Sequence, residues 1–172
     1  MLEQIKASGE IAAGPDFLGT LSRVTAEVLE TMFFDQPVPA PWEHGWIPSA
    51  ALVRLPFEGS HCGLLLLSVS PPVARSIAPA FLGIEPDEVT ETQSSQVLLE
   101  LANILCSSVL SQLWRDCDLR LGPPELIQAE GHIQVERPIQ VERPIEDVLH
   151  ECFVLTEGML SVSIRVCGTE LQ

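Results

Sequence analysis

The sequence predicts an α+β fold in which helices pack on one mainly antiparallel sheet. Two long segments, 16–34 and 90–115, carry apolar residues at the spacing of an α-helix. Several shorter segments have the pattern of β-strands, and two pairs of them are joined by short glycine-containing turns, Glu58-Gly59-Ser60 and Glu157-Gly158. Strands joined by such short turns run antiparallel.

Composition places the chain among folded proteins. Its 172 residues suit a single domain with a sizeable core, and the apolar fraction of 46% is too high for a disordered chain. The longest apolar run, residues 63–67, is far shorter than the roughly 18 residues that a membrane span needs. Residues 1–15 lack the pattern of a secretory signal. We expect them to be a flexible lead-in to one domain over 16–172, in a soluble cytoplasmic protein.

Charge and cysteine usage exclude several functions. The formal net charge of −15 opposes binding to nucleic acid or to an anionic membrane, because both need clustered cations. The five cysteines and four histidines are scattered without the spacing of a metal site, so we expect no metal and no cofactor. Four cysteines fall within apolar patterns and are expected to be buried free thiols: Cys62, Cys106, Cys152 and Cys167.

The first half of the chain predicts a helix, a loop and a hairpin. Asp16 can cap a helix that runs to about Phe34. One face of this helix carries apolar residues, namely Phe17, Leu21, Val24, Val28 and Met32. The proline-rich segment 35–46 predicts a loop without regular structure. Strands are expected at 50–57 and 62–69, and the second is apolar on both faces, which predicts a central strand.

Two further helices follow the hairpin. Ser70 is well placed to cap a helix that opens with Pro71-Pro72 and closes at Gly83. A linker over 83–88 leads to the longest helix of the chain, which is expected to start near Thr90 and to reach Arg115.

The remainder of the chain predicts strands, at 118–121, 126–129, 151–156 and 159–167. The turn Gly122-Pro123-Pro124 separates the first two. Between the second and the third, the hexapeptide IQVERP at 133–138 is repeated at 139–144. Two copies are too few for a solenoid, so we interpret residues 131–147 as a duplicated insertion that lengthens a surface hairpin or loop.

The longest helix carries a narrow polar strip on an otherwise apolar surface. At 100° per residue, the strip falls within an arc of roughly 80°. Its members are Gln96, Glu100, Asn103, Ser107 and Ser111. Asn103 is the only asparagine of the chain, and asparagine is unfavourable inside a helix because its side chain competes for backbone groups.

The strip has a structural and a functional interpretation. It is either the solvated side of the helix, with Glu100 and Asn103 as filler or as a buried pair that fixes helix register, or a functional site. Ser107 and Ser111 could equally be helix-packing positions. Spacing alone favours the structural interpretation, because E-x-x-N is a short pattern.

The stretch Leu99-Glu100-Leu101-Ala102-Asn103 resembles the E-L-x-N signature of the CheC/CheX/FliY phosphatases of bacterial chemotaxis. The strand GLLLLSVS, the helix ARSIAPAFLG and the linker GIEPDEVTE resemble the CheX-like branch in order and spacing, and VLTEGMLSVSIRV resembles its terminal hairpin. The resemblance spans about 17–166 and is interrupted by the IQVERP insertion. It implies a CheC/CheX-like α+β fold.

The resemblance also implies a function. The chain would hydrolyse the phosphoaspartate of a CheY-like receiver domain. The Asn103 amide would orient the attacking water, and Glu100 would engage a lysine of the partner. Gln96, Ser107 and Ser111 would contact the partner, and the Mg²⁺ ion would belong to the receiver. Positioning a water suffices for a reactive acyl phosphate.

The chain departs from the family pattern at several positions. Gln96 stands where the family often has aspartate or serine, and Cys106, Ser107 and Ser108 stand where a glycine and a lysine commonly follow the asparagine. The first helix reads Glu27-Val28-Leu29-Glu30, so at most one E-x-x-N site is expected. The alternatives are a non-catalytic CheX-like module that docks a receiver or another signalling protein, and a structural subunit of a homodimer.

Overall fold

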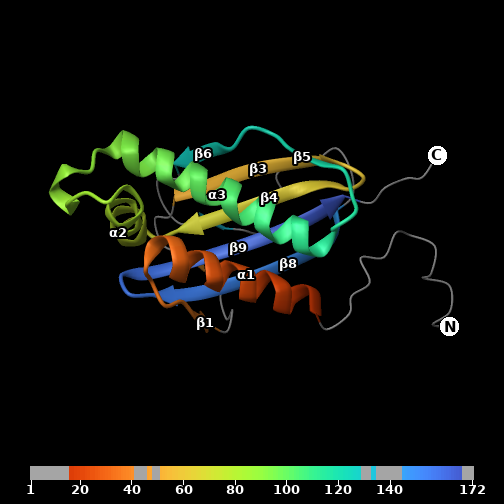
Figure 1. Ribbon diagram of the computed structural model, residues 1–172, viewed down its shortest axis with the longest axis horizontal. Helices are drawn as coiled ribbons and strands as arrows, with labels where there is room; N and C mark the ends of the chain where they lie inside the picture. The colour runs from red at the N-terminus through yellow and green to blue at the C-terminus, as the bar shows by residue number, and fades with distance from the viewer. Residues whose placement is uncertain (1–15, 41–45, 48–50, 129–132, 135–144, 168–172) are drawn as a thin grey trace, which may run out of the picture.

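The computed structural model describes residues 16–40, 46–47, 51–128, 133–134 and 145–167. Three helices lie on one side of a twisted seven-stranded sheet (Figure 1). Every strand pairing in the described parts of the chain is antiparallel, which confirms the predicted α+β class.

The sheet is built around a pair of long central strands, β4 (Cys62–Val69) and β9 (Gly158–Cys167). The order across it is β1-β8-β9-β4-β3-β5, and β6 also pairs with β3. A separate two-stranded ladder joins β2 to β7. The remaining strands are β1 (Val38–Ala40), β2 (Trp46–Ile47), β3 (Ala51–Gly59), β5 (Leu119–Leu121), β6 (Glu125–Gln128), β7 (Ile133–Gln134) and β8 (Ile145–Leu155).

Strand β4 is covered on both faces, as its continuous apolar run predicts. Every residue from Leu64 to Val69 is buried. Leu65, Leu67 and Val69 belong to the main core, and the alternate side chains point to the opposite face of the sheet. A strand with neighbours on both edges and cover on both faces lies at the centre of a domain.

The first helix, α1 (Asp16–Phe33), buries the predicted face with one exception. Phe17, Leu21, Val24 and Val28 are buried, whereas Met32 is 36% exposed and its place is taken by Phe33. Phe33 lies one full turn beyond the buried Leu29, and its ring stacks on that of Phe81 at a centroid distance of 5.3 Å. The prediction for Met32 was wrong because the core-facing stripe shifts by one residue in the last turn.

The proline-rich segment after α1 is not the irregular loop that its composition predicts. Residues Val38–Ala40 form β1, which pairs with β8 at the edge of the sheet. Proline is tolerated in an edge strand because one side of such a strand needs no backbone donor, and Pro39 lies opposite Phe153. Short strand β2 also begins at Trp46, within the predicted loop.

A left-handed residue and a buried carboxylate make the chain reversal between α1 and β1. Phe34 adopts a φ of 55°, which ends the helix. The carboxylate of the buried Asp35 accepts hydrogen bonds from the backbone N–H of Thr156 at 3.3 Å and from its hydroxyl at 3.0 Å. These bonds connect the end of α1 to the turn between β8 and β9.

Helix α2 (Pro71–Leu82) begins and ends where the sequence predicts. Gly83 is left-handed, with a φ of 66°, and its N–H bonds to the carbonyl of Pro79. Ser70 occupies the N-cap position, but its side chain does not cap the helix. The Ser70 hydroxyl instead accepts a hydrogen bond from the N–H of Met159, so it connects α2 to the start of β9.

Helix α3 (Glu91–Leu113) starts at the predicted position with a complete capping box. The Thr90 hydroxyl accepts from the N–H of Gln93, and the Gln93 side chain accepts from the N–H of Thr90. A short 3₁₀ turn, η1 (Pro86–Glu88), occupies the predicted linker. The helix ends two residues before Arg115, with Trp114 as its C-cap.

The strands near the C-terminus differ from the prediction mainly in length. Strand β6 begins one residue earlier than expected, and β8 begins at Ile145 instead of 151. Its first residues, 145–147, therefore overlap the end of the predicted insertion over 131–147. Most of the IQVERP repeat and the predicted lead-in over 1–15 lie outside the described residues.

Candidate functional site

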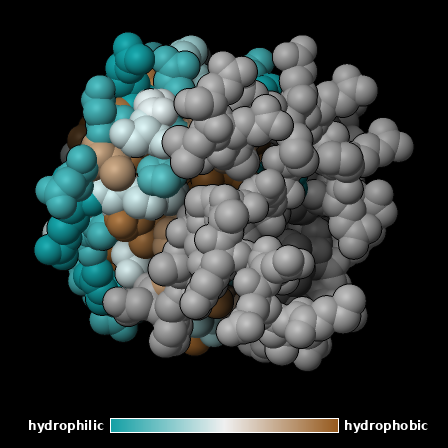
Figure 2. Space-filling view, turned by 90° about the vertical axis from the view of Figure 1, so that its right-hand side faces the viewer, coloured by the Kyte–Doolittle hydropathy of each residue, from teal (hydrophilic) through white to brown (hydrophobic). Residues whose placement is uncertain are grey.

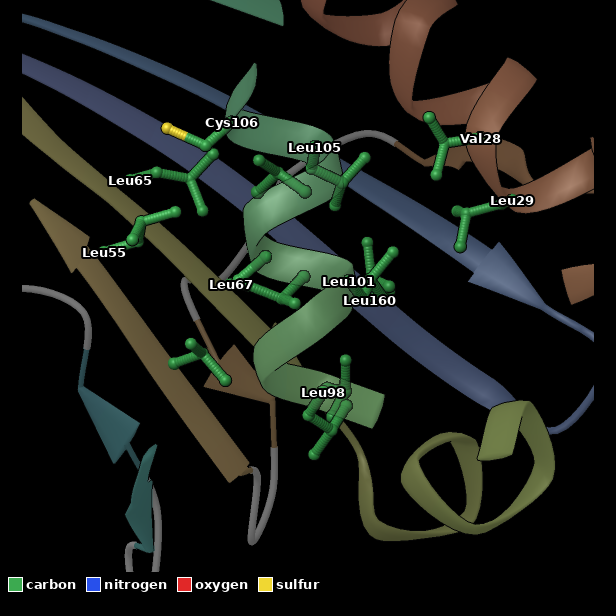
Figure 3. Close-up of a cluster of buried hydrophobic side chains, with 14 of the residues drawn as sticks. Val28, Leu29, Leu55, Leu65, Leu67, Leu98, Leu101, Leu105, Cys106 and Leu160 are labelled. Atoms are coloured by element: carbon green, nitrogen blue, oxygen red, sulfur yellow. The ribbon is translucent and has the colours of Figure 1, made fainter. Parts of the chain in front are cut away.

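The candidate site lies on α3, which packs against the sheet and against α1 and α2. Its inner face points at the sheet, where Leu98, Leu101 and Leu105 meet leucines of the central strands (Figure 3). Eight residues of α3 are buried: Val97, Leu98, Leu101, Ala102, Leu105, Cys106, Val109 and Leu110. This packing fixes the rotation of the helix and hence the direction of its opposite face.

The burial of α3 also accounts for its strong hydropathy. Among the described residues, α3 is the one helix long and apolar enough to cross a membrane by length and composition. Its apolar side chains pack against the sheet and against α1 and α2. A core helix of this kind passes the same test as a membrane span.

The predicted strip runs along the outer face of α3. Gln96, Glu100, Ser107 and Ser111 are exposed, and Asn103 is partly buried. The structure therefore brings all five predicted residues onto one accessible surface. An exposed Glu100 argues against the interpretation in which Glu100 and Asn103 form a buried pair that fixes register. Their predicted roles in catalysis and partner binding stay predictions.

The side chains of Glu100 and Asn103 make no hydrogen bond or ion pair among the described residues. The two positions are one helical turn apart, which places their β-carbons about 5–6 Å from each other. A carboxamide and a carboxylate at this separation can reach the same small group on a docked partner.

The serines of the strip are occupied within the helix. The Ser107 hydroxyl donates to the carbonyl oxygen of Asn103 at 2.8 Å, and that of Ser111 donates to the carbonyl of Ser108 at 3.0 Å. Such back-bonding holds a hydroxyl close to the helix surface. Beyond Asn103 the side chains of the strip therefore project little from the helix. In its N-terminal half, the longer side chains of Gln96 and Glu100 project further.

Helix α1 packs against α3 and supplies a cation that the sequence interpretation did not include. The Arg23 guanidinium donates to Glu27 at 2.8 Å and to the side-chain oxygen of Gln112 on α3. Gln112 interrupts the apolar arc of α3 in the sequence, and the contact with Arg23 explains its place. No sequence signal connects these residues, because they are 89 positions apart.

None of the groups with displaced pKa values belongs to the strip. Burial lowers the pKa of His61 and raises those of Glu151 and Cys152. Burial raises the pKa of the Cys106 thiol to about 12. Within the described parts of the chain, no three His, Cys, Asp or Glu side chains form a potential metal site. The strip itself can therefore offer an amide, a carboxylate and hydroxyl groups to a ligand.

The fold is that of the CheC/CheX-like chemotaxis proteins. A CheX protein from Desulfovibrio desulfuricans is similar in structure, with a TM-score of 0.68 at 17% sequence identity over 90% of this chain and 99% of that one. CheX from Vibrio vulnificus gives a TM-score of 0.70 at 16% identity, over 88% and 96% of the two chains.

The family follows from the sequence comparison. A family model described as chemotaxis phosphatase CheX matches residues 51–145, which is more than half of the chain and contains α3. The chain belongs to this family. No curated protein sequence matches it. A further structural relative is CheX of Borrelia burgdorferi in a complex with CheY, BeF₃ and Mg²⁺, with a TM-score of 0.63 at 16% identity over 88% of this chain and 98% of that chain.

Proposed function

We propose that the protein is a phosphatase that hydrolyses the phosphoaspartate of a CheY-type receiver domain. The observation that carries this proposal is the exposed pair of Glu100 and Asn103 on the outer face of α3, in a chain of the CheX family. The pair offers polar groups that make no hydrogen bond or ion pair in the part of the chain that the structure describes. The CheX–CheY complex of Borrelia burgdorferi supports a receiver as the partner. Such a partnership would place the protein in the cytoplasm.

In the proposed mechanism, the helix face inserts into the active site of the receiver. The Asn103 carboxamide accepts a hydrogen bond from one water and orients its lone pair in line with the phosphoryl group. Asparagine is suited to this because it carries no negative charge to repel the phosphoryl oxygens. The water attacks phosphorus, the bond to the aspartyl oxygen breaks, and the products are inorganic phosphate and the free aspartate.

Glu100 positions the partner in this mechanism. Its carboxylate pairs with a lysine of the receiver, which fixes the phosphoryl group relative to Asn103. The short side chains of Ser107 and Ser111 leave room for a loop of the receiver. Gln96 contacts the receiver at the N-terminal end of the strip. A Mg²⁺ ion that balances the phosphoryl charge would be held by the receiver, and this chain would need no cofactor of its own.

The second candidate function is binding to a receiver without hydrolysis. The observation that favours it is Gln96, which occupies an exposed position where the family often has aspartate or serine. Glutamine at position 96, one turn before Glu100, could allow the receiver to dock while the attacking water is held in the wrong position. A misplacement of about 1 Å can cost roughly 100-fold in rate.

The experiment measures the decay of a phosphorylated receiver with and without this protein. Wild-type protein is expected to accelerate decay. Asn103→Ala should lose on the order of 100-fold of this acceleration because the water is no longer oriented, with little change in binding. Glu100→Gln should weaken binding by roughly 10-fold, which corresponds to about 1.4 kcal/mol.

The exposed carboxylate Glu30 on α1 provides the matched control, since Glu30→Gln removes the same charge away from the strip. It should leave both rate and binding unchanged. If wild-type protein binds phosphorylated receivers without accelerating decay, the non-catalytic module is the correct function.

A further inference from the structure

Two cysteines face each other at one end of the central strand pair. Cys62 is the first residue of β4, Cys167 is the last residue of β9, and the register places them directly opposite. In Figure 1 this is the end where the arrow of β9 points and where β4 begins. Figure 2 faces that end, and the described residues at the left edge of the view are mostly hydrophilic.

The register places both side chains on the same face of the sheet. Side chains alternate along each strand, and the next pair on that face is Leu64 with Arg165. The N–H of Ser70 bonds to the carbonyl of Met159. Hydrogen-bonded and non-hydrogen-bonded pairs alternate along an antiparallel ladder. Ser70 and Met159 are a hydrogen-bonded pair, and the register from there to Cys62 and Cys167 is uninterrupted over eight residues, so Cys62 and Cys167 are a hydrogen-bonded pair too. The α-carbons of such a pair lie about 5.5 Å apart, within the range that disulfides span.

Accessibility distinguishes this pair from the other cysteines. Cys62 and Cys167 are partly exposed, whereas Cys106 and Cys152 are buried in the domain. Cys117 is also partly exposed, but it lies in the turn after α3, where its N–H bonds to the carbonyl of Trp114. The sequence alone predicted that both Cys62 and Cys167 would be buried.

We propose that Cys62 and Cys167 form a reversible disulfide, which makes this end of the sheet a site of oxidative modification. The oxidant is a small disulfide such as oxidised glutathione. The proposal does not depend on the phosphatase function, because neither cysteine lies on α3.

The reaction is two successive thiol–disulfide exchanges. The thiolate of one cysteine attacks a sulfur of oxidised glutathione, forms a mixed disulfide and releases one glutathione thiolate. The thiolate of the second cysteine then attacks the sulfur of the first and releases the second glutathione. Two protein thiols are oxidised, one glutathione disulfide is reduced, and the two protons end on the glutathione thiols.

The geometry predicts that the bond is labile. The β-carbons of a hydrogen-bonded strand pair lie toward the upper end of about 4.5–5.5 Å, and a relaxed disulfide prefers about 3.8 Å. The ends of the strands must therefore move together for the bond to form. A strained, accessible disulfide has a more oxidising potential and is readily reduced, as a regulatory bond requires.

The test equilibrates the full-length protein with mixtures of reduced and oxidised glutathione, followed by alkylation of free thiols and peptide mapping. The expected result is one linked peptide pair that joins Cys62 to Cys167 within a single chain. Closing a loop of roughly 100 residues should raise the Tm by about 10 °C, and dithiothreitol should reverse the shift.

Variants separate this pair from its neighbours. Cys62→Ser and Cys167→Ser should each abolish the Tm shift, and Cys117→Ser should keep it. Circular dichroism of the reduced variants checks that each is folded, and either serine variant alone is sufficient for the test. A bond to Cys117, a disulfide between two chains, or a stable glutathione adduct without ring closure would each overturn the proposal.

Discussion

At the scale of single residues, Asn103 lies where asparagine lowers helix stability, and its carboxamide is available to a partner. It lies in the middle of α3, where asparagine is less favourable than alanine by about 0.5–0.7 kcal/mol. Its carboxamide makes no hydrogen bond within the described residues, so nothing in the domain compensates this cost. A residue kept for function often has such a stability cost.

The stability of Asn103→Ala tests this interpretation separately from activity. Alanine should raise the free energy of unfolding by about 0.5 kcal/mol, because helix propensity improves and no hydrogen bond is lost. Urea denaturation of the wild type and the variant measures the difference. A decrease of about 1 kcal/mol or more would instead indicate that Asn103 fixes the register of α3.

His150 on β8 provides a pH dependence at the residue scale. Burial, followed by the charge of Arg165, lowers its pKa from 6.5 to about 4. The unfolded chain therefore binds a proton near pH 6.5 that the folded chain does not bind until about pH 4. The contribution of this group to stability is fully present above pH 6.5 and is lost as the pH falls toward 4.

The difference between wild type and His150→Gln isolates this effect from the carboxylates, which titrate in the same range. Denaturation at a series of pH values should show that the wild type loses more stability than the variant between about pH 6.5 and 4. Parallel curves would show that the proton of His150 is not linked to folding.

At the scale of elements, the ends of α2 show which signals act locally. Gly83 is left-handed and an added β-carbon would meet no atom within 4 Å, so its requirement is purely conformational. Ser70 has the sequence of a cap, yet its hydroxyl bonds to Met159 on a strand that lies 89 residues away. The glycine signal depends on backbone sterics alone, whereas the serine signal competes with tertiary partners.

Substitutions at Gly83 measure this local requirement. Gly83→Ala should destabilise the protein by about 1–2 kcal/mol, because a β-carbon disfavours the left-handed conformation. Gly83→Asn should cost less, because asparagine tolerates that conformation. Thermal denaturation compares the two variants. A loss in Gly83→Asn equal to or larger than that in Gly83→Ala would contradict a requirement for the left-handed conformation alone.

At the scale of the whole molecule, negative charge is in large excess over positive charge. Acidic residues number 24 against 9 basic ones. Arg23 pairs with Glu27 and Arg120 pairs with Glu58, and all four side chains are more than half exposed. Exposed pairs contribute little to stability, so the repulsion among the carboxylates is the larger electrostatic effect.

The charge predicts a stabilisation by salt. Raising NaCl from about 0.02 M to about 0.3 M shortens the screening length and should raise the Tm by about 2–4 °C, as roughly 1 kcal/mol would. Sodium chloride is preferred to sulfate, since sulfate also strengthens the burial of apolar groups. An unchanged Tm would show that the carboxylates are too far apart to repel each other.

The elements that the sequence predicts well are those with strong local periodicity. The spacing of α3, its start at Thr90 and the span of β4 follow from the pattern of apolar residues and caps. Strand β1 was missed because its pairing with β8 depends on residues more than a hundred positions away. Local composition does not contain that information.

The features of the candidate site also separate into those that local sequence spacing predicts and those that depend on tertiary contacts. The sequence alone placed Glu100 and Asn103 on one face of a helix, because the α-helical repeat depends only on spacing. The tertiary structure determined that this face is the exposed one, because packing against the sheet buries the opposite side of α3. It also determined that Arg23 contacts Gln112 on α3 and that Cys62 faces Cys167, since both contacts join distant parts of the chain.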